Sequence, residues 1–331
     1  MQIYQWSELE GHFQSSLLLG NGSSIAIDKN FIYGTLKEQA FELGFLTKDI
    51  QQLFTDFETE DFEKVLNYVW QANYVNKTLG VHDTRTEVAY HQIRQCLIET
   101  VRHIHPERDA VLNDIKKIRE FTKTFKTILS LNYDLILYWA IMYGNELHDG
   151  HIYKDCFNST QQLHDDWAEM RKPYNARQRD ISLVFYPHGN LVLYKDHDGL
   201  EFKNRDGGNG LLNAILTSWE TGSFSPLFVS ECSSVKKIAS ILSSNYLSTV
   251  YKEVIPSLEN DLTIYGMGFN DNDMHILSQI RKSKINKIAI SVYNQDADFI
   301  ERSSRAIKKL WGEKFELAYF DSSSKGCWNN A

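Results

Sequence analysis

The sequence predicts an α/β fold with a mainly parallel sheet, helices on both faces and a helical insertion. Three observations predict this fold. Short apolar runs alternate with helical patterns, most regularly from residue 226 onward, and such alternation is typical of parallel sheets with right-handed crossovers. Several of these runs end in glycine or in a small polar residue. Between the first run and the second, residues 48–122 show helical spacing without a strand pattern.

The length of 331 residues fits two average domains or one α/β domain with a helical insertion, and we expect a single domain that spans residues 1–331. The chain has 42% hydrophobic and 13% aromatic residues, a formal net charge of −8 and no dense run of lysine or arginine. These values favour a large core and argue against direct binding of nucleic acid. Because we find neither a basic leader nor an apolar span of about 18 residues, we expect a cytoplasmic protein without a membrane anchor. The four cysteines form no C-x-x-C pair, so we expect no metal.

The first strand lies at the start of residues 16–27, where three leucines lead into Gly20-Asn21-Gly22 and then Ser23. A run this short and apolar is typical of a strand that is buried on both faces. Glycines at its end let the backbone come close to a ligand, and a loop of this kind that leads to a helix binds a nucleotide pyrophosphate through its amides. A simple turn between two elements fits the same residues.

The second strand, residues 126–131, follows the helical insertion at about 48–122 and ends in Asn132-Tyr133-Asp134. A helix is expected at residues 135–143. Asn132 either contacts a ligand or caps this helix. The next segment, about 145–180, is polar and predicts an irregular stretch, for which a solvated loop is favoured over a metal site.

The remaining chain alternates more regularly. Residues 183–186 predict a short strand that ends in Pro187-His188-Gly189, and residues 191–194 predict the return strand of a hairpin. His188 is either a functional group or a histidine of the core. Further strands are expected at 227–229, 262–265, 287–292 and 315–320, and helices at 233–243, 245–255, 273–282 and 297–311. We expect residues 322–331 to be loose or to lie against a partner.

The ends of the strands carry the candidate functional residues. In a parallel, Rossmann-like sheet the carboxyl ends of the strands lie on one edge, so residues that are far apart in the sequence converge on one crevice. The residues at these ends are Gly20, Asn21, Gly22 and Ser23; Asn132 and Asp134; His188; Gly266, Gly268 and Asp271; and Asn294.

The order of these motifs resembles the sirtuin-like NAD-binding superfamily. The matching segments are GNGSS at 20–24, LNYD at 131–134, PHGNL at 187–191, IYGMGFNDND at 264–273 and SVYN at 291–294. Within that superfamily the chain resembles a bacterial single-domain family similar to NAD-hydrolysing effectors of anti-phage defence. The resemblance implies that NAD is bound as a substrate. It places the pyrophosphate on Gly20, Asn21, Gly22 and Ser23, and the adenosine half near Gly266, Gly268, Asp271 and Asn294.

Cleavage of the N-glycosidic bond of NAD leaves an oxocarbenium-like ribose, which suggests a role for three residues. An asparagine offers a donor and an acceptor without charge, so we expect Asn132 to position the ribose and a water. A histidine takes up a proton near neutral pH, so we expect His188 to be the general base. Asp134 would hold the local geometry. Whether the product is ADP-ribose or a cyclic isomer depends on which nucleophile reaches the ribose first.

One departure from the resemblance bears on the reaction. Sirtuin deacylases carry a four-cysteine zinc module between the His-Gly motif and the later glycine motif, where this chain has only Cys232. This difference argues against peptide deacylation and for an NAD glycohydrolase that depletes NAD in abortive infection. Such an enzyme would need restraint, through a homo-oligomer or through a separately encoded subunit such as a nucleotide-sensing protein or an ATPase. The alternatives are an ADP-ribosyltransferase or deacylase, and a sensor of NAD or an ADP-ribose derivative without turnover.

Overall fold

The computed structural model describes residues 2–32, 35–164, 166–173, 175, 178–196, 198–206, 210–220, 225–229 and 234–330. The predicted α/β class is confirmed. The described chain forms an eight-stranded sheet in which every pair is parallel, in the order β1-β11-β10-β9-β2-β3-β5-β4. In that order the strands are Ile3–Tyr4, Glu316–Asp321, Lys284–Val292, Glu259–Tyr265, Ser16–Leu19, Thr127–Ser130, Asp180–Phe185 and His151–Lys154.

The strand order reverses beside β2, at the centre of the sheet. Leu17, Leu18 and Leu19 of this strand are completely buried, as expected for a strand covered on both faces. The chain passes from β2 to β3 on one side and returns much later to β9 on the other side. The carboxyl ends of β2 and β9 therefore flank the switch point, where open α/β sheets bind their ligands.

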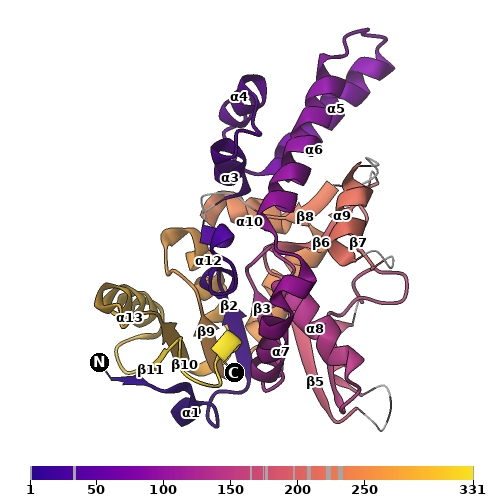
Figure 1. Cartoon of the computed structure of the whole chain (residues 1–331). Coiled ribbons are helices and arrows are strands. Elements are labelled where there is room, and N and C mark those ends of the chain that lie inside the picture. The colour runs from indigo at the N-terminus through magenta and orange to yellow at the C-terminus, as the bar shows by residue number, and fades with distance from the viewer. Residues whose placement is uncertain are drawn as a thin grey trace.

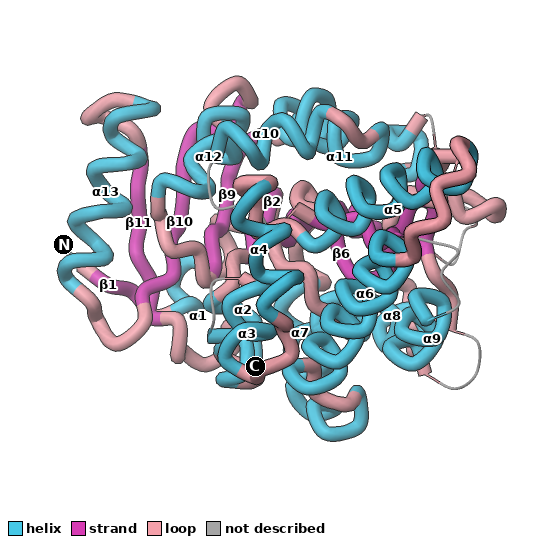
Figure 2. Tube along the Cα trace, turned by 90° about the horizontal axis from the view of Figure 1, so that it is seen from above, coloured by secondary structure: helices cyan, strands magenta, loops and turns pink. Residues whose placement is uncertain are grey.

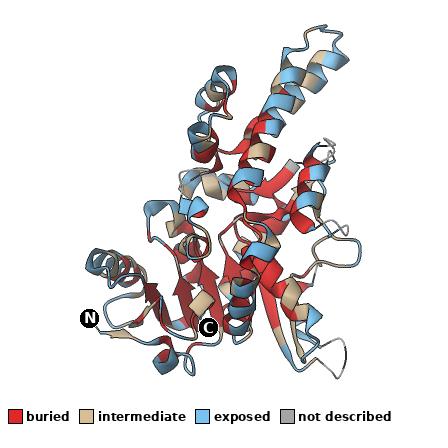
Figure 3. Ribbon diagram, in the orientation of Figure 1, coloured by how far each residue is buried: buried red, intermediate tan, exposed pale blue. Residues whose placement is uncertain are grey.

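Helices cover both faces of the sheet (Figure 2). Crossovers leave the switch point in opposite directions, and right-handed connections then place their helices on opposite faces. One face carries α7 (Leu112–Thr122) and α8 (Ile136–Glu146), and the other carries α12 (Met274–Ile280) and α13 (Ala297–Trp311). Figure 3 shows that the buried residues follow the sheet and the inner sides of these helices.

The chain between β2 and β3 is helical. It contains α2 (Gly22–Ile25), α3 (Leu36–Glu42), α4 (Lys48–Asp56), α5 (Phe62–Thr78), α6 (Arg85–Ile104) and α7. Helical structure thus starts before residue 48, since a capping box between Thr35 and Glu38 begins α3. Helices α5 and α6 form a hairpin that projects from the body of the molecule (Figure 1).

Two predictions about strands after residue 183 are wrong. Residues 191–194 do not form a hairpin with 183–186, and residues 227–229 do not return to the parallel sheet. They belong instead to a small antiparallel sheet with the order β7-β6-β8, whose strands are Glu201–Lys203, Gly189–Lys195 and Ser225–Phe228. The reason lies at Gly189, which has a positive φ of 77° and whose Cβ would stand 2.1 Å from the carbonyl oxygen of Leu227.

The segment at 145–180 is less irregular than expected. It contains β4, which pairs with β5 at the edge of the large sheet. The four residues His-Ile-Tyr-Lys of this strand show no clear alternation of polar and apolar side chains, so the sequence pattern does not indicate it.

Of the other helices, α1 is not expected from the sequence, and the rest lie close to their expected positions with one interruption. They are α1 (Trp6–Leu9), α9 (Leu211–Glu220), α10 (Ser234–Leu242) and α11 (Asn245–Thr249). The helix expected at 245–255 is α11 followed by a π-helical turn at Val250–Val254 and a 3-10 turn at Ile255–Ser257. Among the described residues, no helix combines the length and apolar character needed to cross a membrane.

The C-terminal segment is packed against its own chain, which corrects the expectation of a loose tail or a partner contact. Cys327 and Trp328 are almost completely buried. The indole Nε1 of Trp328 donates to the carbonyl oxygen of Ser23 at 2.8 Å, and its ring lies 5.7 Å from that of Tyr265. The C-terminus therefore supports the segment just after β2 (Figure 1).

We predict that Trp328→Ala lowers the free energy of unfolding by about 3–5 kcal/mol, because it empties a large buried site and leaves the Ser23 carbonyl without its donor. Urea unfolding of the full chain measures this change. Lys325→Ala, at an exposed position of the same segment, is the control and should change stability by less than about 0.5 kcal/mol. Equal stability of the two variants would contradict the packed tail.

Candidate functional site

The loops after β2 and β9 touch through their backbones. The amide of Gly20 donates to the carbonyl oxygen of Tyr265 at 2.9 Å, and the amide of Gly22 donates to that of Gly266 at 2.8 Å. A Cβ on Gly20 would lie 2.6 Å from the Cα of Met267, and one on Gly22 would lie 2.8 Å from the Cα of Gly266. These glycines are therefore required for the two loops to meet.

This packing changes the role expected for the glycine motif. The amides of Gly20 and Gly22 bond to the β9 loop, and the amide of Ser23 donates to the carbonyl oxygen of Gly20. The side-chain amide of Asn21 donates to the carbonyl oxygen of Phe31. In this structure the motif thus holds two strand ends together, and three of its amides are already used within the protein.

Asn132 is the centre of a hydrogen-bond network beside this motif. Its Nδ2 donates to the hydroxyls of Ser23 and Ser24, both at 2.8 Å, and to the carbonyl oxygen of Gly20 at 3.2 Å. Because a carbonyl only accepts, the NH₂ group of Asn132 faces the β2 loop. The other amide atom, Oδ1, accepts no hydrogen bond from the described residues, so it is the atom that a ligand would meet.

Asp134 joins two helices, and its side chain rather than that of Asn132 bonds to the first amide of α8. The N-cap residue of α8 is Leu135. One oxygen of the Asp134 carboxylate accepts from the hydroxyl of Ser24, and the other accepts from the amide of Ile136 at 2.8 Å. The amide of Leu135, which lies between Asp134 and Ile136 in the sequence, donates to Nε2 of the buried His105 at 2.9 Å. Burial lowers the pKa of His105, so this ring acts as a neutral acceptor. The sequence analysis did not identify it.

The segment with the His-Gly motif is attached to the end of β3. The side chain of Asn190 donates to the carbonyl oxygen of Asp134 at 2.6 Å, and the amide of Leu191 donates to that of Tyr133 at 2.8 Å. Asn190 is completely buried. The structure therefore brings the second and third motifs together, as the parallel sheet predicts.

His188 contacts another histidine and not Asn132. Its Nε2 lies 2.9 Å from Nε2 of His275, and the two rings stack at an interplanar angle of 21°. Both side chains are buried. Beside them Lys237 bonds to Asp273 at 2.7 Å. Sequence reasoning missed His275 and Lys237, and only the position of His275 at the start of α12, just after the Gly266 loop, could have pointed to it.

Burial keeps both rings of this histidine pair neutral. Desolvation lowers the pKa of His188 well below its ordinary value, and the positive charge of Lys237 lowers it further. The same two causes lower the pKa of His275 to about 4, against the opposing charge of Asp273. When both rings are neutral, one of the two facing nitrogens donates a hydrogen bond and the other accepts it. Nδ1 of His275 is buried and has no hydrogen-bond partner among the described residues.

The other candidate residues lie further out. Gly268, Asp271 and Asn294 are exposed. The carbonyl oxygen of Asp271 accepts from the hydroxyl of Ser234, and Asn294 lies two residues beyond the end of β10 with a φ of 51°. None of the three bonds to the β2 loop. Cys232 lies outside the described residues, and within those residues no group of three or more His, Cys, Asp or Glu side chains is placed to hold a metal.

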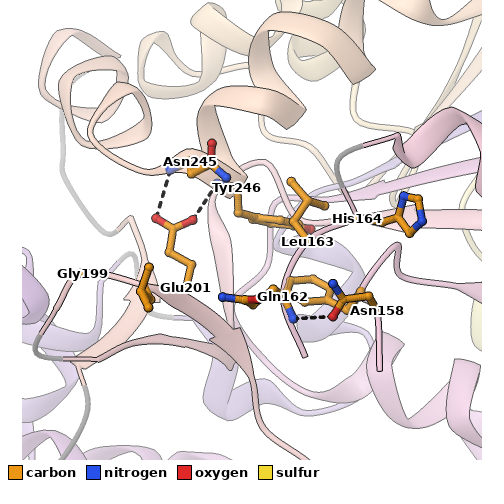
Figure 4. Close-up of a pocket in the computed structure, with 10 residues that line it drawn as sticks. Asn158, Gln162, Leu163, His164, Gly199, Glu201, Asn245 and Tyr246 are labelled. Carbon is orange, nitrogen blue, oxygen red and sulfur yellow. Dashed lines mark hydrogen bonds between the residues drawn. The ribbon is translucent and has the colours of Figure 1, made fainter. Parts of the chain in front are cut away.

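Two cavities lie away from these loops. One has a volume of about 480 Å³ and lies between the turn at 157–164, the β6–β7 turn and the start of α11 (Figure 4). There the carboxylate of Glu201 accepts from the amides of Asn245 and Tyr246. The other, of about 450 Å³, lies between α6 and α9.

Comparison with known proteins places almost the whole chain in one family. The family model described as "Domain of unknown function (DUF4917)" matches residues 17–328. This range extends from β2 to Trp328, and so contains every candidate motif at the strand ends. No curated protein matches the sequence.

We predict that Gly20→Ala destabilises the protein by about 2–3 kcal/mol or more, because its Cβ would press against the backbone of Met267, which cannot rotate away. Gly11→Ala is the matched control, since a Cβ there would meet no atom within 4 Å. Urea unfolding compares the two. If both variants are as stable as the wild type, the β2 and β9 loops are not packed in this way.

We also predict that stability falls as the pH is lowered. Below about pH 6.5 the unfolded chain protonates His275 while the folded chain, with a pKa of about 4, does not. The free energy of unfolding should therefore decrease between about pH 6.5 and pH 4, by roughly 3 kcal/mol from this residue. His275→Gln should reduce this dependence, whereas His12→Gln, at an exposed position, should retain it. Identical pH profiles for all three proteins would refute a buried neutral pair.

Proposed function

The chain belongs to the family described as domain of unknown function DUF4917, and we propose that it is an NAD glycohydrolase that cleaves NAD to nicotinamide and ADP-ribose. The observation that carries the proposal is the meeting of three motif-bearing segments at the switch point of the sheet, with the free Oδ1 of Asn132 among them. Open α/β sheets generally bind nucleotides at the switch point of the strand order.

NAD would lie across the ends of β2 and β9. The pyrophosphate is assigned to residues 20–23, and the adenosine half to the exposed side of the second loop, near Gly268, Asp271 and Asn294. Because the amides of Gly20 and Gly22 bond to the β9 loop, the pyrophosphate needs other donors, or the two loops must separate when it binds. The nicotinamide ribose would then lie toward Asn132.

In the proposed reaction the bond between the ribose C1′ and the nicotinamide nitrogen breaks, and its electron pair neutralises the pyridinium ring. Oδ1 of Asn132 accepts a hydrogen bond from a ribose hydroxyl or from the attacking water, and so orients it. The water oxygen then bonds to C1′, and neutral His188 takes up its proton. A histidine with a low pKa is a weak base, but an oxocarbenium-like centre needs only a weak base to assist the water.

The biological role is also a proposal. An NADase that is always active would deplete the cell of NAD, so we propose a cytoplasmic effector of anti-phage defence that is restrained as a homo-oligomer or by a separately encoded sensor or ATPase. The resemblance to sirtuin-like effectors supports this role.

Binding without turnover is the second candidate. The observation that favours it is the use of the Asn132 amide to hold the β2 loop, together with the absence of a contact between the described side chains of Asn132 and His188. A sensor of NAD or of an ADP-ribose derivative needs a fixed pocket but no base.

We predict that the purified chain releases nicotinamide from NAD, and that Asn132→Ala and His188→Ala each lower the rate by about 10²-fold or more. Chromatography of the released nicotinamide measures the rate, and circular dichroism checks that the variants fold. His12→Ala, at an exposed position outside the crevice, should keep the wild-type rate. Tight binding of NAD by calorimetry with no release over hours would reject the hydrolase and support the sensor.

A further inference from the structure

The outer half of the α5–α6 hairpin has its polar side chains between the helices. The amide of Asn76 donates to the hydroxyl of Thr86 at 3.3 Å, and this hydroxyl donates to the side-chain oxygen of Asn73 at 3.2 Å. Lys77 and Glu87 form an ion pair at 3.1 Å across the same pair of helices. Two helices that pack on each other normally bury their apolar side chains, so this part of the hairpin is unusual.

The apolar side chains of this region point outward. Tyr68 and Val75 of α5 are 40% and 51% exposed, and Leu79, which directly follows the helix, is 72% exposed. One edge of Tyr68 is already covered, because its ring lies 5.1 Å from that of Phe57, so only its exposed part is open to a partner. Ala72 is exposed as well. These four exposed residues, which we call the α5 seam, are spaced by four, three and four positions. That spacing places them on one stripe of the helix and is the spacing of a coiled-coil contact.

Closer to the body of the molecule, the same helix packs its apolar side chains into the core. Val65, Leu66 and Val69 are buried, so the first turns of α5 contribute to the core. The apolar side chains near the start of the helix are therefore mainly buried, whereas Ala72, Val75 and Leu79 further along are exposed. The hairpin that carries them projects from the body (Figure 1). A contiguous exposed apolar stripe on a projecting element is typical of an interaction surface.

We propose that the α5 seam binds the α5 seam of a second copy of this chain, antiparallel and around a two-fold axis. The spacing reads the same in both directions, with its centre between residues 73 and 74. In such a pair Tyr68 faces the partner subunit's Leu79, and Ala72 faces the partner subunit's Val75. A large residue then meets a large one and a small residue meets a medium one, as self-complementary packing requires.

The charge next to the seam does not oppose a second copy. Each chain carries a net charge of −8, so two copies repel each other unless the contact region is neutral. The exposed positions that flank the seam, Gln71 and Thr78, are uncharged. An isologous pair therefore brings no like charges together at its centre. The projection of the hairpin lets two copies approach through their seams (Figure 1).

This inference names the surface of the homo-oligomer proposed above, but it rests on the seam and not on NAD cleavage. Its test therefore measures mass rather than activity. Sedimentation of the full chain between about 1 and 100 μM should show a species of twice 38.4 kDa that dissociates on dilution. Val75→Glu should raise the dissociation constant by about 100-fold or more, because each dimer would bury two unpaired carboxylates.

Gln92→Glu is the matched control. It adds the same charge to an exposed position of α6, where it lines the cavity toward α9, and it should leave the dissociation constant unchanged. A wild-type monomer throughout the range, or a dimer that Val75→Glu does not weaken, overturns the proposal and leaves the seam to a different protein. Nicotinamide release by the same samples is measured independently, so the result for the dimer does not decide the result for NAD cleavage.

A cross-linking experiment tests the orientation. An oxidised mixture of Ala72→Cys and Val75→Cys chains should form a covalent heterodimer, because these positions face each other in the antiparallel pair. Val75→Cys alone should cross-link at least about 10-fold less under the same conditions. Preferred cross-linking of Val75→Cys to itself would overturn the antiparallel arrangement.

Discussion

The contact between the loops after β2 and β9 determines much of the remaining structure. It lies where the strand order reverses, and it forms because Gly20, Gly22 and Gly266 have no side chains to separate the two backbones. The position of α2 follows from it, and Asn132 binds the serines of α2. The C-terminal Trp328 then packs below the same segment. Residues from both ends of the chain thus depend on one close approach of two backbones.

Local sequence patterns predicted the elements that local chemistry determines. The strands β2 and β3 are short apolar runs, and β9 and β10 each end in a buried, mainly apolar run. Helix α13 has a strong amphipathic pattern, and the expected range 297–311 matches the observed helix. Other elements depend on partners far away in the sequence. The strand β4 has only four residues and forms because β5 offers an edge, and the small sheet forms because Gly189 lets the chain reach Leu227. The polar tail is buried because Tyr265 and the β2 loop receive Trp328. No local pattern reports such pairings.

In the candidate site, too, some features follow from local sequence patterns and others depend on distant partners. Parallel topology correctly placed the Asn132 and Asp134 segment beside the His188 segment, since strand ends share an edge. The partners of individual side chains did not follow from the sequence. Asp134 rather than Asn132 bonds to the first amide of α8, and His188 faces His275, which belongs to a helix nearly ninety positions later. A residue's place on a strand follows from periodicity. Its hydrogen-bond partner depends on how two elements pack, and the local sequence pattern of either element does not show this.

The helical insertion links the crevice to the proposed surface of association. Because the insertion begins at the carboxyl end of β2, its helices rise from the edge of the sheet that carries the strand-end motifs (Figure 1). The insertion returns through His105, whose ring receives the amide of Leu135 next to Asp134. Both ends of the insertion are therefore bonded into the network around Asn132. The α5–α6 hairpin is thus part of one insertion that is attached to the candidate site at both ends.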